Sequence, residues 1–121
     1  METNSDSVQV LKNRLREFAA ARNWQKFHNP KDLAMALHIE AAELAEFFLW
    51  KSPDESLEVA KEKRVPLLEE MADVFIYLLH LSIAVDCDLA RIALEKISKN
   101  EDRYPVQACY GSDVKYTEIE S

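Results

Sequence analysis

Residues 67–81 read LLEEMADVFIYLLHL, and this stretch decides the fold class. From residue 74 to residue 81 every position is apolar except Tyr77 and His80. A helix that is apolar on all sides is buried, either in a core or in an interface between subunits. A chain of 121 residues has little depth in which to bury it. The stretch therefore predicts a helix over about 66–85 and association with further copies of the chain.

Helical signals also run through the rest of the chain. Apolar side chains recur at helical spacing from residue 8 to residue 19. Asn29, Pro30 and Asp32 then form a helix start, in which asparagine caps the first turn. The chain contains one glycine, which leaves few tight turns for connecting strands. The predicted helices cover about residues 5–22, 30–51, 53–63, 66–85 and 89–100.

We predict an all-α fold of about five helices, with an antiparallel four-helix bundle as its core. The length of the chain suits a single domain over 1–121. Its core is predicted over about 8–104, and the polar segment 105–121 is predicted to be an extended or irregular tail. Burial of the helix over 66–85 against other copies would make the protein a homo-oligomer.

The balance of charge argues against several classes of protein. The formal net charge is −7, whereas binding to a nucleic-acid polymer requires a basic surface. The longest apolar run, 74–85, is too short to span a bilayer, and residues 2–7 lack the pattern of a secretory signal. The two cysteines have no zinc or redox spacing. We therefore expect a cytoplasmic protein with neither a membrane nor a nucleic-acid polymer as partner.

Two pairs of acids interrupt the apolar helical segments, Glu40 with Glu43 and Glu70 with Asp73. Residues three apart lie on the same face of a helix, so each pair projects two carboxylates from one stripe. Buried carboxylates are very costly unless something compensates their charge. If the two helices are antiparallel neighbours, the stripes can meet and hold one or two cations. Magnesium is the expected ion, because it takes oxygen ligands and bridges carboxylates to phosphates.

Two alternatives compete with a magnesium site. A single acid pair is usually a solvated helix face, but here the neighbouring positions are almost all apolar. A di-iron bundle would require a histidine three residues after a glutamate, and no glutamate in this sequence has one.

Glu46 and Glu69 lie near the pairs, and one of these carboxylates would orient an attacking water as general base.

Aromatic side chains near the acids predict a surface for a flat ligand. Tyr77 lies one turn beyond Asp73, on the same stripe as the acids. Trp24 and Trp50 offer flat faces on which a nucleobase can stack, although capping the ends of the core is an equal alternative for them. Structural or surface roles are expected for the three histidines, His28, His38 and His80.

Together these features resemble the MazG-like superfamily of all-α nucleoside triphosphate pyrophosphohydrolases, whose signature is a Glu-x-x-Glu pair followed by a Glu-x-x-Asp pair. The dCTP pyrophosphatase branch is the most similar. The likeness extends over about residues 8–118. It is carried by the stretches 22–28 (RNWQKFH), 40–46 (EAAELAE), 70–78 (EMADVFIYL), 96–105 (KISKNEDRYP) and 115–118 (KYTE).

The resemblance implies Mg²⁺-dependent hydrolysis of a nucleoside triphosphate, such as dCTP or a related pyrimidine deoxynucleotide, to the monophosphate and pyrophosphate. It also implies a dimer or a homotetramer. The family's catalytic and metal-binding acids match Glu40, Glu43, Glu70 and Asp73. Its base and sugar pocket corresponds to Trp24, Trp50, Tyr77 and Asn100. The remaining substrate contacts correspond to Lys96, Arg103 and Tyr104, with Lys115 or Tyr116 as further candidates for the phosphates.

A non-catalytic alternative is left open by the sequence. A helical oligomer that binds a nucleotide or a protein partner would also carry such acids, as a structural cation site. The base preference, the number of ions, the identity of the general base and the choice between dimer and tetramer are open as well.

Overall fold

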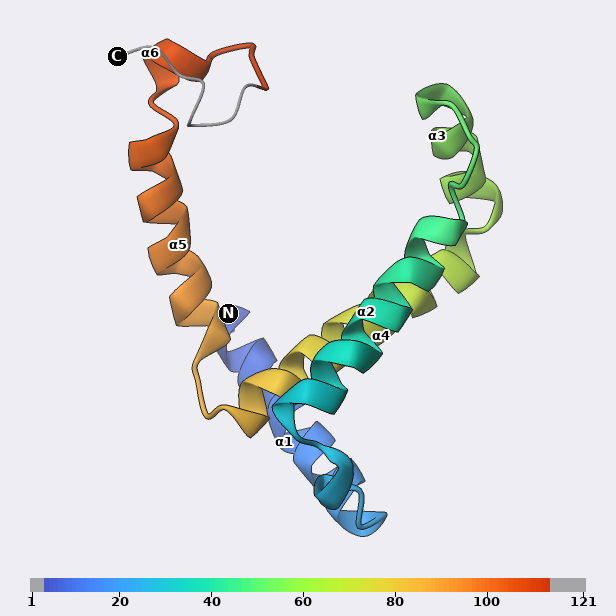
Figure 1. The fold of residues 1–121 in the computed structure, drawn as a ribbon, viewed down its shortest axis with the longest axis vertical. Coiled ribbons are helices and arrows are strands. Elements are labelled where there is room, and N and C mark those ends of the chain that lie inside the picture. The colour runs from blue at the N-terminus through green and yellow to red at the C-terminus, as the bar shows by residue number, and fades with distance from the viewer. Residues whose placement is uncertain (1–3, 114–121) are drawn as a thin grey trace. The chain divides into compact units, whose positions relative to one another are not determined.

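The computed structural model describes residues 4–113, and every regular element in that range is helical (Figure 1). The prediction of an all-α fold is therefore confirmed. The elements are α1 (Asn4–Ala21), the 3-10 turn η1 (Gln25–Phe27), α2 (Pro30–Glu46), α3 (Pro53–Glu62), α4 (Arg64–Ala84), α5 (Leu89–Arg103) and α6 (Val106–Cys109).

The helices group into two compact units, Met1–Cys87 and Asp88–Ser121. The first unit holds α1 to α4, and the second holds α5 and α6. The prediction that the whole chain forms one domain stays a prediction.

Within the first unit, α4 is the helix that the other three contact. α2 and α4 run in opposite directions and lie side by side, which is the main packing contact of the unit (Figure 1). α1 and α3 contact α4 less extensively. This arrangement confirms the expected antiparallel pairing of the two helices that carry the acid pairs. The buried apolar side chains come from α1, α2 and α4: Ala19, Leu33, Leu67 and Leu79.

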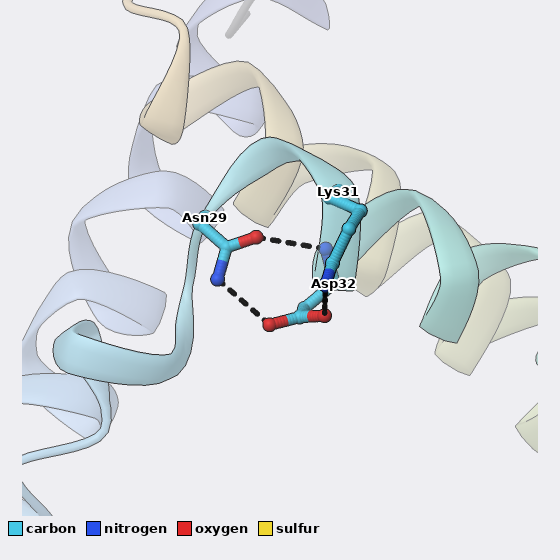
Figure 2. Close-up of polar contacts among 3 residues, drawn as sticks. All are labelled: Asn29, Lys31 and Asp32. Atoms are coloured by element: carbon cyan, nitrogen blue, oxygen red, sulfur yellow. Dashed lines mark hydrogen bonds and ion pairs between the residues drawn. The ribbon is translucent and has the colours of Figure 1, made fainter.

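The start of α2 is fixed by the cap that the sequence predicts. Asn29 Oδ1 accepts a hydrogen bond of 2.9 Å from the backbone N–H of Asp32, and Asn29 Nδ2 donates one of 2.7 Å to Asp32 Oδ2 (Figure 2). Lys31 Nζ lies 3.5 Å from Asp32 Oδ1. The hydrogen bond from Asn29 lowers the pKa of Asp32, and its carboxylate suits the positive end of the helix. The cap determines where α2 begins and hence the phase of the acids farther along it.

The end of α2 differs from the prediction. The helix was expected to continue to about residue 51, but it ends at Glu46 and is followed by turns over 47–50. Trp50 has a φ of +64°, a left-handed conformation that a continuing α-helix does not allow. Ser52 then caps α3 in a capping box with Glu55, while Pro53 disfavours helical geometry at the residue before it.

The C-terminal part also differs from the prediction in two places. α5 continues to Arg103 instead of ending near residue 100. The tail predicted to be irregular from residue 105 contains the short helix α6, which begins after Pro105. Proline cannot continue the ladder of α5 but is compatible with a new helix start. The predicted contacts in the stretch 115–118, including those of Lys115 and Tyr116, lie outside the described residues.

Two further expectations can be compared with the residues that the structure describes. No described helix is both long enough and apolar enough to cross a membrane. Cys87 and Cys109 are both free thiols, as their isolated positions in the sequence predict.

Candidate active site

The two acid stripes meet where α2 and α4 pack. Glu40 and Glu43 lie on α2, and Glu70 lies on α4. One carboxylate oxygen from each of these three residues lies within 4.8 Å of the others. The meeting follows from the helical repeat, because residues three apart share a face and the two helices are antiparallel. We call these three residues the acid cluster.

Within residues 4–113, no basic side chain is among the groups that shift the pKa of Glu40 or of Glu70. Hydrogen bonding to the Glu43 carboxyl, followed by burial and by the proximity of Glu40, raises the pKa of Glu70 to about 8. Burial, together with the negative charges of Glu43 and Asp73, raises the pKa of Glu40, although a hydrogen bond with Glu70 acts in the opposite direction. Like charges this close disfavour the ionised forms of one another, and a bound cation would offset that repulsion.

One oxygen of the acid cluster provides a further test of fit to a metal ion. Glu70 Oε1 is screened from solvent and accepts no hydrogen bond from a described N–H or hydroxyl donor, because its polar neighbours are the carboxyl groups of Glu40 and Glu43. A screened oxygen without a partner is costly, and coordination to a cation would remove that cost. Carboxylate oxygens are also the ligands that hard divalent cations prefer. The donor set therefore fits a metal ion of this class.

Asp73, the fourth predicted acid, lies beside the acid cluster but is not among the three oxygens that converge. Its negative charge contributes to the raised pKa of Glu40. Its side chain is exposed and lines a cavity of about 340 Å³. Asp73 thus borders both the acid cluster and the cavity.

This cavity, which we call the aromatic cavity, has Trp24 and Tyr77 in its wall together with Asp73. Trp24 is 46% exposed and its ring meets that of Phe18 edge-on, with centroids 5.6 Å apart. A second cavity of about 240 Å³ is also lined by Trp24 and Tyr77. The structure therefore brings two of the predicted stacking residues together next to a predicted metal ligand. The wall of the aromatic cavity is completed by Leu15, Phe18, His28, Ile76 and His80.

Trp50, the third predicted aromatic residue, occupies a different environment. It lies beyond the end of α2, and its side chain is 92% exposed. A surface indole can still contact a ligand, but Trp50 is not one of the residues that line the aromatic cavity. Its predicted contact with the base stays a prediction.

The remaining predicted substrate residues belong to the second unit. Lys96, Asn100 and Arg103 lie on α5, and Tyr104 follows the helix as its C-cap. The backbone N–H of Tyr104 donates a hydrogen bond of 2.8 Å to the carbonyl of Asn100, whose side chain is half-buried. Their participation in the site of the first unit stays a prediction.

Two features near the site were not predicted from the sequence. His28 and His80 line the aromatic cavity, although only structural or surface roles were expected for them. His80 follows Asp73 by seven residues, a spacing that keeps both on one face of α4 and provides a signal for its position. Separately, Lys63 lines a shallow cavity of about 230 Å³ with Glu43, Glu46 and Phe47.

In this all-α fold the antiparallel helices α2 and α4 bring Glu40, Glu43 and Glu70 together into a cluster of carboxyl groups. Comparison with known sequences identifies the class further. The sequence model of the MazG-like family matches residues 35–119, and the chain belongs to this family.

Named relatives align with this sequence over most of its length. dCTP pyrophosphatase 1 of Rattus norvegicus is 45% identical over 105 residues, which are 85% of this chain and 62% of the relative. The Homo sapiens protein of the same name is 42% identical over the same extent. The chain therefore spans about 62% of the length of these curated relatives.

A solved structure has the same fold. The crystal structure of a pyrophosphatase from Archaeoglobus fulgidus superimposes with a TM-score of 0.80 at 40% identity. The match covers 87% of this chain and 98% of that one. Such agreement over nearly the whole of the archaeal chain places the arrangement of helices within the family fold.

Proposed function

We propose that this chain is a Mg²⁺-dependent nucleoside triphosphate pyrophosphohydrolase that cleaves dCTP or a related pyrimidine deoxynucleotide between its α and β phosphates. The products would be the monophosphate and pyrophosphate. The names of the relatives support this activity. The single structural observation that carries it is the aromatic cavity, which borders the acid cluster through Asp73.

Mg²⁺ would be held by Glu40, Glu43 and Glu70, with Asp73 as the fourth ligand. When bound, such an ion neutralises phosphate oxygens and stabilises the charge that develops during cleavage. The support for this ion is the all-oxygen donor set and the unpartnered Glu70 Oε1.

The chain's own side chains would place the substrate for cleavage. Trp24 and Tyr77 would stack on the base, because stacking on an aromatic face contributes about 1–3 kcal/mol per base. Glu46, which shares a cavity with Glu43, is a suitable group to orient the attacking water. Lys96 and Arg103 would contact the phosphates, Asn100 would contact the base or sugar, and Tyr104 would also contact the substrate, as the resemblance implies.

The test is a panel of the eight common nucleoside triphosphates, incubated with the purified chain and MgCl₂. We expect release of monophosphate and pyrophosphate, fastest with a pyrimidine deoxynucleotide. Release of orthophosphate, or no turnover with any triphosphate, would contradict the proposal. Binding of Mg²⁺-nucleotide without turnover, measured by isothermal titration, would instead favour the non-catalytic oligomer.

We also propose that the protein is a cytoplasmic homo-oligomer, a dimer or a tetramer. Apolar side chains on α2 and α4 remain exposed in the single chain, which supports burial against another copy. Light scattering coupled to size exclusion would measure the mass in solution, and a monomeric mass at micromolar concentration would contradict the proposal. The exposed side chains include Met35, Ile39, Leu68, Met71 and Phe75.

A further inference from the structure

A pair of histidines, His28 and His80, lines the aromatic cavity. The ring centroids of His28 and His80 lie 4.5 Å apart, with the ring planes tilted by 53°. Tyr77 lies next to them, with its ring centroid 6.2 Å from that of His80. Both histidines line the aromatic cavity, and both also line a neighbouring cavity of about 300 Å³. The imidazoles therefore border open space on two sides.

His80 is an unusual residue to find at this position. Its side chain is only 8% exposed, on a helix whose neighbouring positions are apolar. Among the described residues its ring contacts are those with His28 and Tyr77, and no hydrogen bond joins its nitrogens to a described residue. The ring nitrogens are nevertheless reached by solvent from the adjoining cavities, since Glu70 Oε1 is the only described side-chain atom that is both fully screened and without a partner. A ligand in the aromatic cavity would replace that solvent as the hydrogen-bond partner of His80.

The protonation state of His80 suits hydrogen bonding to a neutral ligand. Burial, and secondarily the proximity of His28, lowers the pKa of His80 and so favours its uncharged imidazole. A neutral imidazole carries one donor and one acceptor. Where its tautomer is held, the nitrogen that faces the ligand either accepts from an amino group or donates to a carbonyl, but does not do both.

The spacing along α4 matches the dimensions of a nucleotide. Asp73, Tyr77 and His80 follow one another on a single stripe of the helix. Seven residues separate the first from the last, which is about 10 Å along the helix axis. With the α-phosphate near Asp73 and the base against Tyr77, the far edge of the base would lie beside His80.

We propose that His80, with His28 packed against it, contacts the polar edge of the substrate's base and determines which base is accepted. This inference rests on the proposed function, since it specifies the nucleotide site further. His80 is thus a specificity-determining residue: it should increase the binding affinity for nucleotides with one base and not for nucleotides in general.

The test measures binding, so that it does not depend on turnover. The probes are the α,β-imido analogues of dCTP and dTTP, which cannot be cleaved between the α and β phosphates, titrated by calorimetry in the presence of Mg²⁺. His80→Leu should weaken binding of the preferred analogue about tenfold or more and that of the other less than twofold, as expected for a lost hydrogen bond in a buried site. His80→Gln, which keeps a donor and an acceptor, should restore part of the preference.

His38 provides the matched control, because it is an exposed histidine on α2 and lines none of the three cavities around Trp24, His28 and His80. His38→Leu should leave both affinities unchanged. Equal weakening of both analogues by His80→Leu would overturn the proposal, since it would indicate a purely structural role. An unchanged preference would overturn it as well.

The wild-type protein provides a measurement that needs no variant to fold. In ¹⁵N-detected spectra of its imidazoles, the His80 nitrogens should shift when the dCTP analogue is added. Absence of a shift at saturation would overturn the inference. If base-dependent binding requires His80 but no triphosphate is hydrolysed, the proposed activity fails and the base contact stands. If His80→Leu hydrolyses triphosphates with the same base preference as the wild type, the base contact proposed for His80 fails and the proposed activity stands.

Discussion

Lys12 Nζ donates a hydrogen bond of 3.0 Å to the backbone carbonyl of Cys87, joining α1 to the segment that follows α4. The lysine side chain is only 7% exposed. The carbonyl lies just past the C-terminal end of α4, where a positive charge is favourable. A single side chain thus ties the first helix of the unit to its last.

Replacing Lys12 with methionine should therefore destabilise the protein. Methionine keeps the apolar stem of the side chain but removes the donor, so the expected loss is about 1–3 kcal/mol of unfolding free energy. Chemical denaturation followed by circular dichroism measures it. Arg14→Met, an exposed position on the same helix, should change the unfolding free energy by less than about 0.5 kcal/mol. Equal effects of the two substitutions would contradict a specific role for the Lys12 hydrogen bond.

The stability of the metal-free protein should depend on pH through Glu70. Its pKa is raised from 4.5 to about 8 in the folded state, so the folded state binds more protons than the unfolded state between these values. Stability from this group is therefore complete below about pH 4.5 and is lost as the pH rises towards 8. Thermal denaturation in EDTA should show a steeper fall in Tm over this range for the wild type than for Glu70→Gln.

Adding Mg²⁺ should change this pH dependence. A cation that binds the ionised acid cluster stabilises the folded state by mass action. This stabilisation is largest at high pH, where the carboxyl groups are deprotonated and protons do not compete with the cation. The increase in Tm on adding MgCl₂ should therefore be larger at pH 8 than at pH 5. An equal increase at both values would contradict the assignment of the acid cluster as the metal site.

Glu43→Gln should abolish turnover without loss of the fold. The amide removes one negative ligand but has nearly the same shape. Loss of a group that only orients a metal ligand costs about 10- to 100-fold in activity, and loss of the ligand itself should lower kcat/KM by more than that. The initial rate of pyrophosphate release measures this effect. Glu58→Gln, an exposed position on α3, is the matched control and should retain full activity. Near-normal activity of Glu43→Gln would remove the acid cluster from the mechanism.

The two tryptophans should behave differently when replaced by leucine. Trp24→Leu should raise KM about five- to a hundredfold, because stacking on one base contributes about 1–3 kcal/mol. Trp50→Leu should leave the unfolding free energy within about 0.5 kcal/mol of the wild type, since the indole is exposed. Steady-state kinetics of Trp50→Leu then tests its predicted contact: an unchanged KM would exclude Trp50 from the binding site.

The acid cluster could be predicted from the sequence because its geometry depends on local periodicity. Residues three apart share one face of their helix, so a single acid that faces the partner helix brings its neighbour of the same pair close to the contact. The pairing itself was indicated by the apolar positions around Glu40 and Glu70. A short connection through α3 also favours neighbouring helices of opposite direction.

Other features depend on contacts that no local pattern encodes. The end of α2 is set by the left-handed backbone at Trp50 and by the capping box that follows, which override the helical propensity of residues 47–51. The burial of His80 depends on η1 and the residues next to it, which bring His28 against α4. The contact between His80 and His28 therefore could not be predicted from the apolar sequence around His80.

The stripe of Asp73, Tyr77 and His80 has a consequence for how this protein can vary. All three positions belong to one uninterrupted helix, so each can be substituted but none can be shifted independently of the others. Inserting a single residue between Asp73 and His80 would rotate one end of the stripe by about 100° relative to the other. Homologues that keep both ends of the site should therefore show no insertion or deletion in this segment, whereas differences in length should fall in the connections before and after α4.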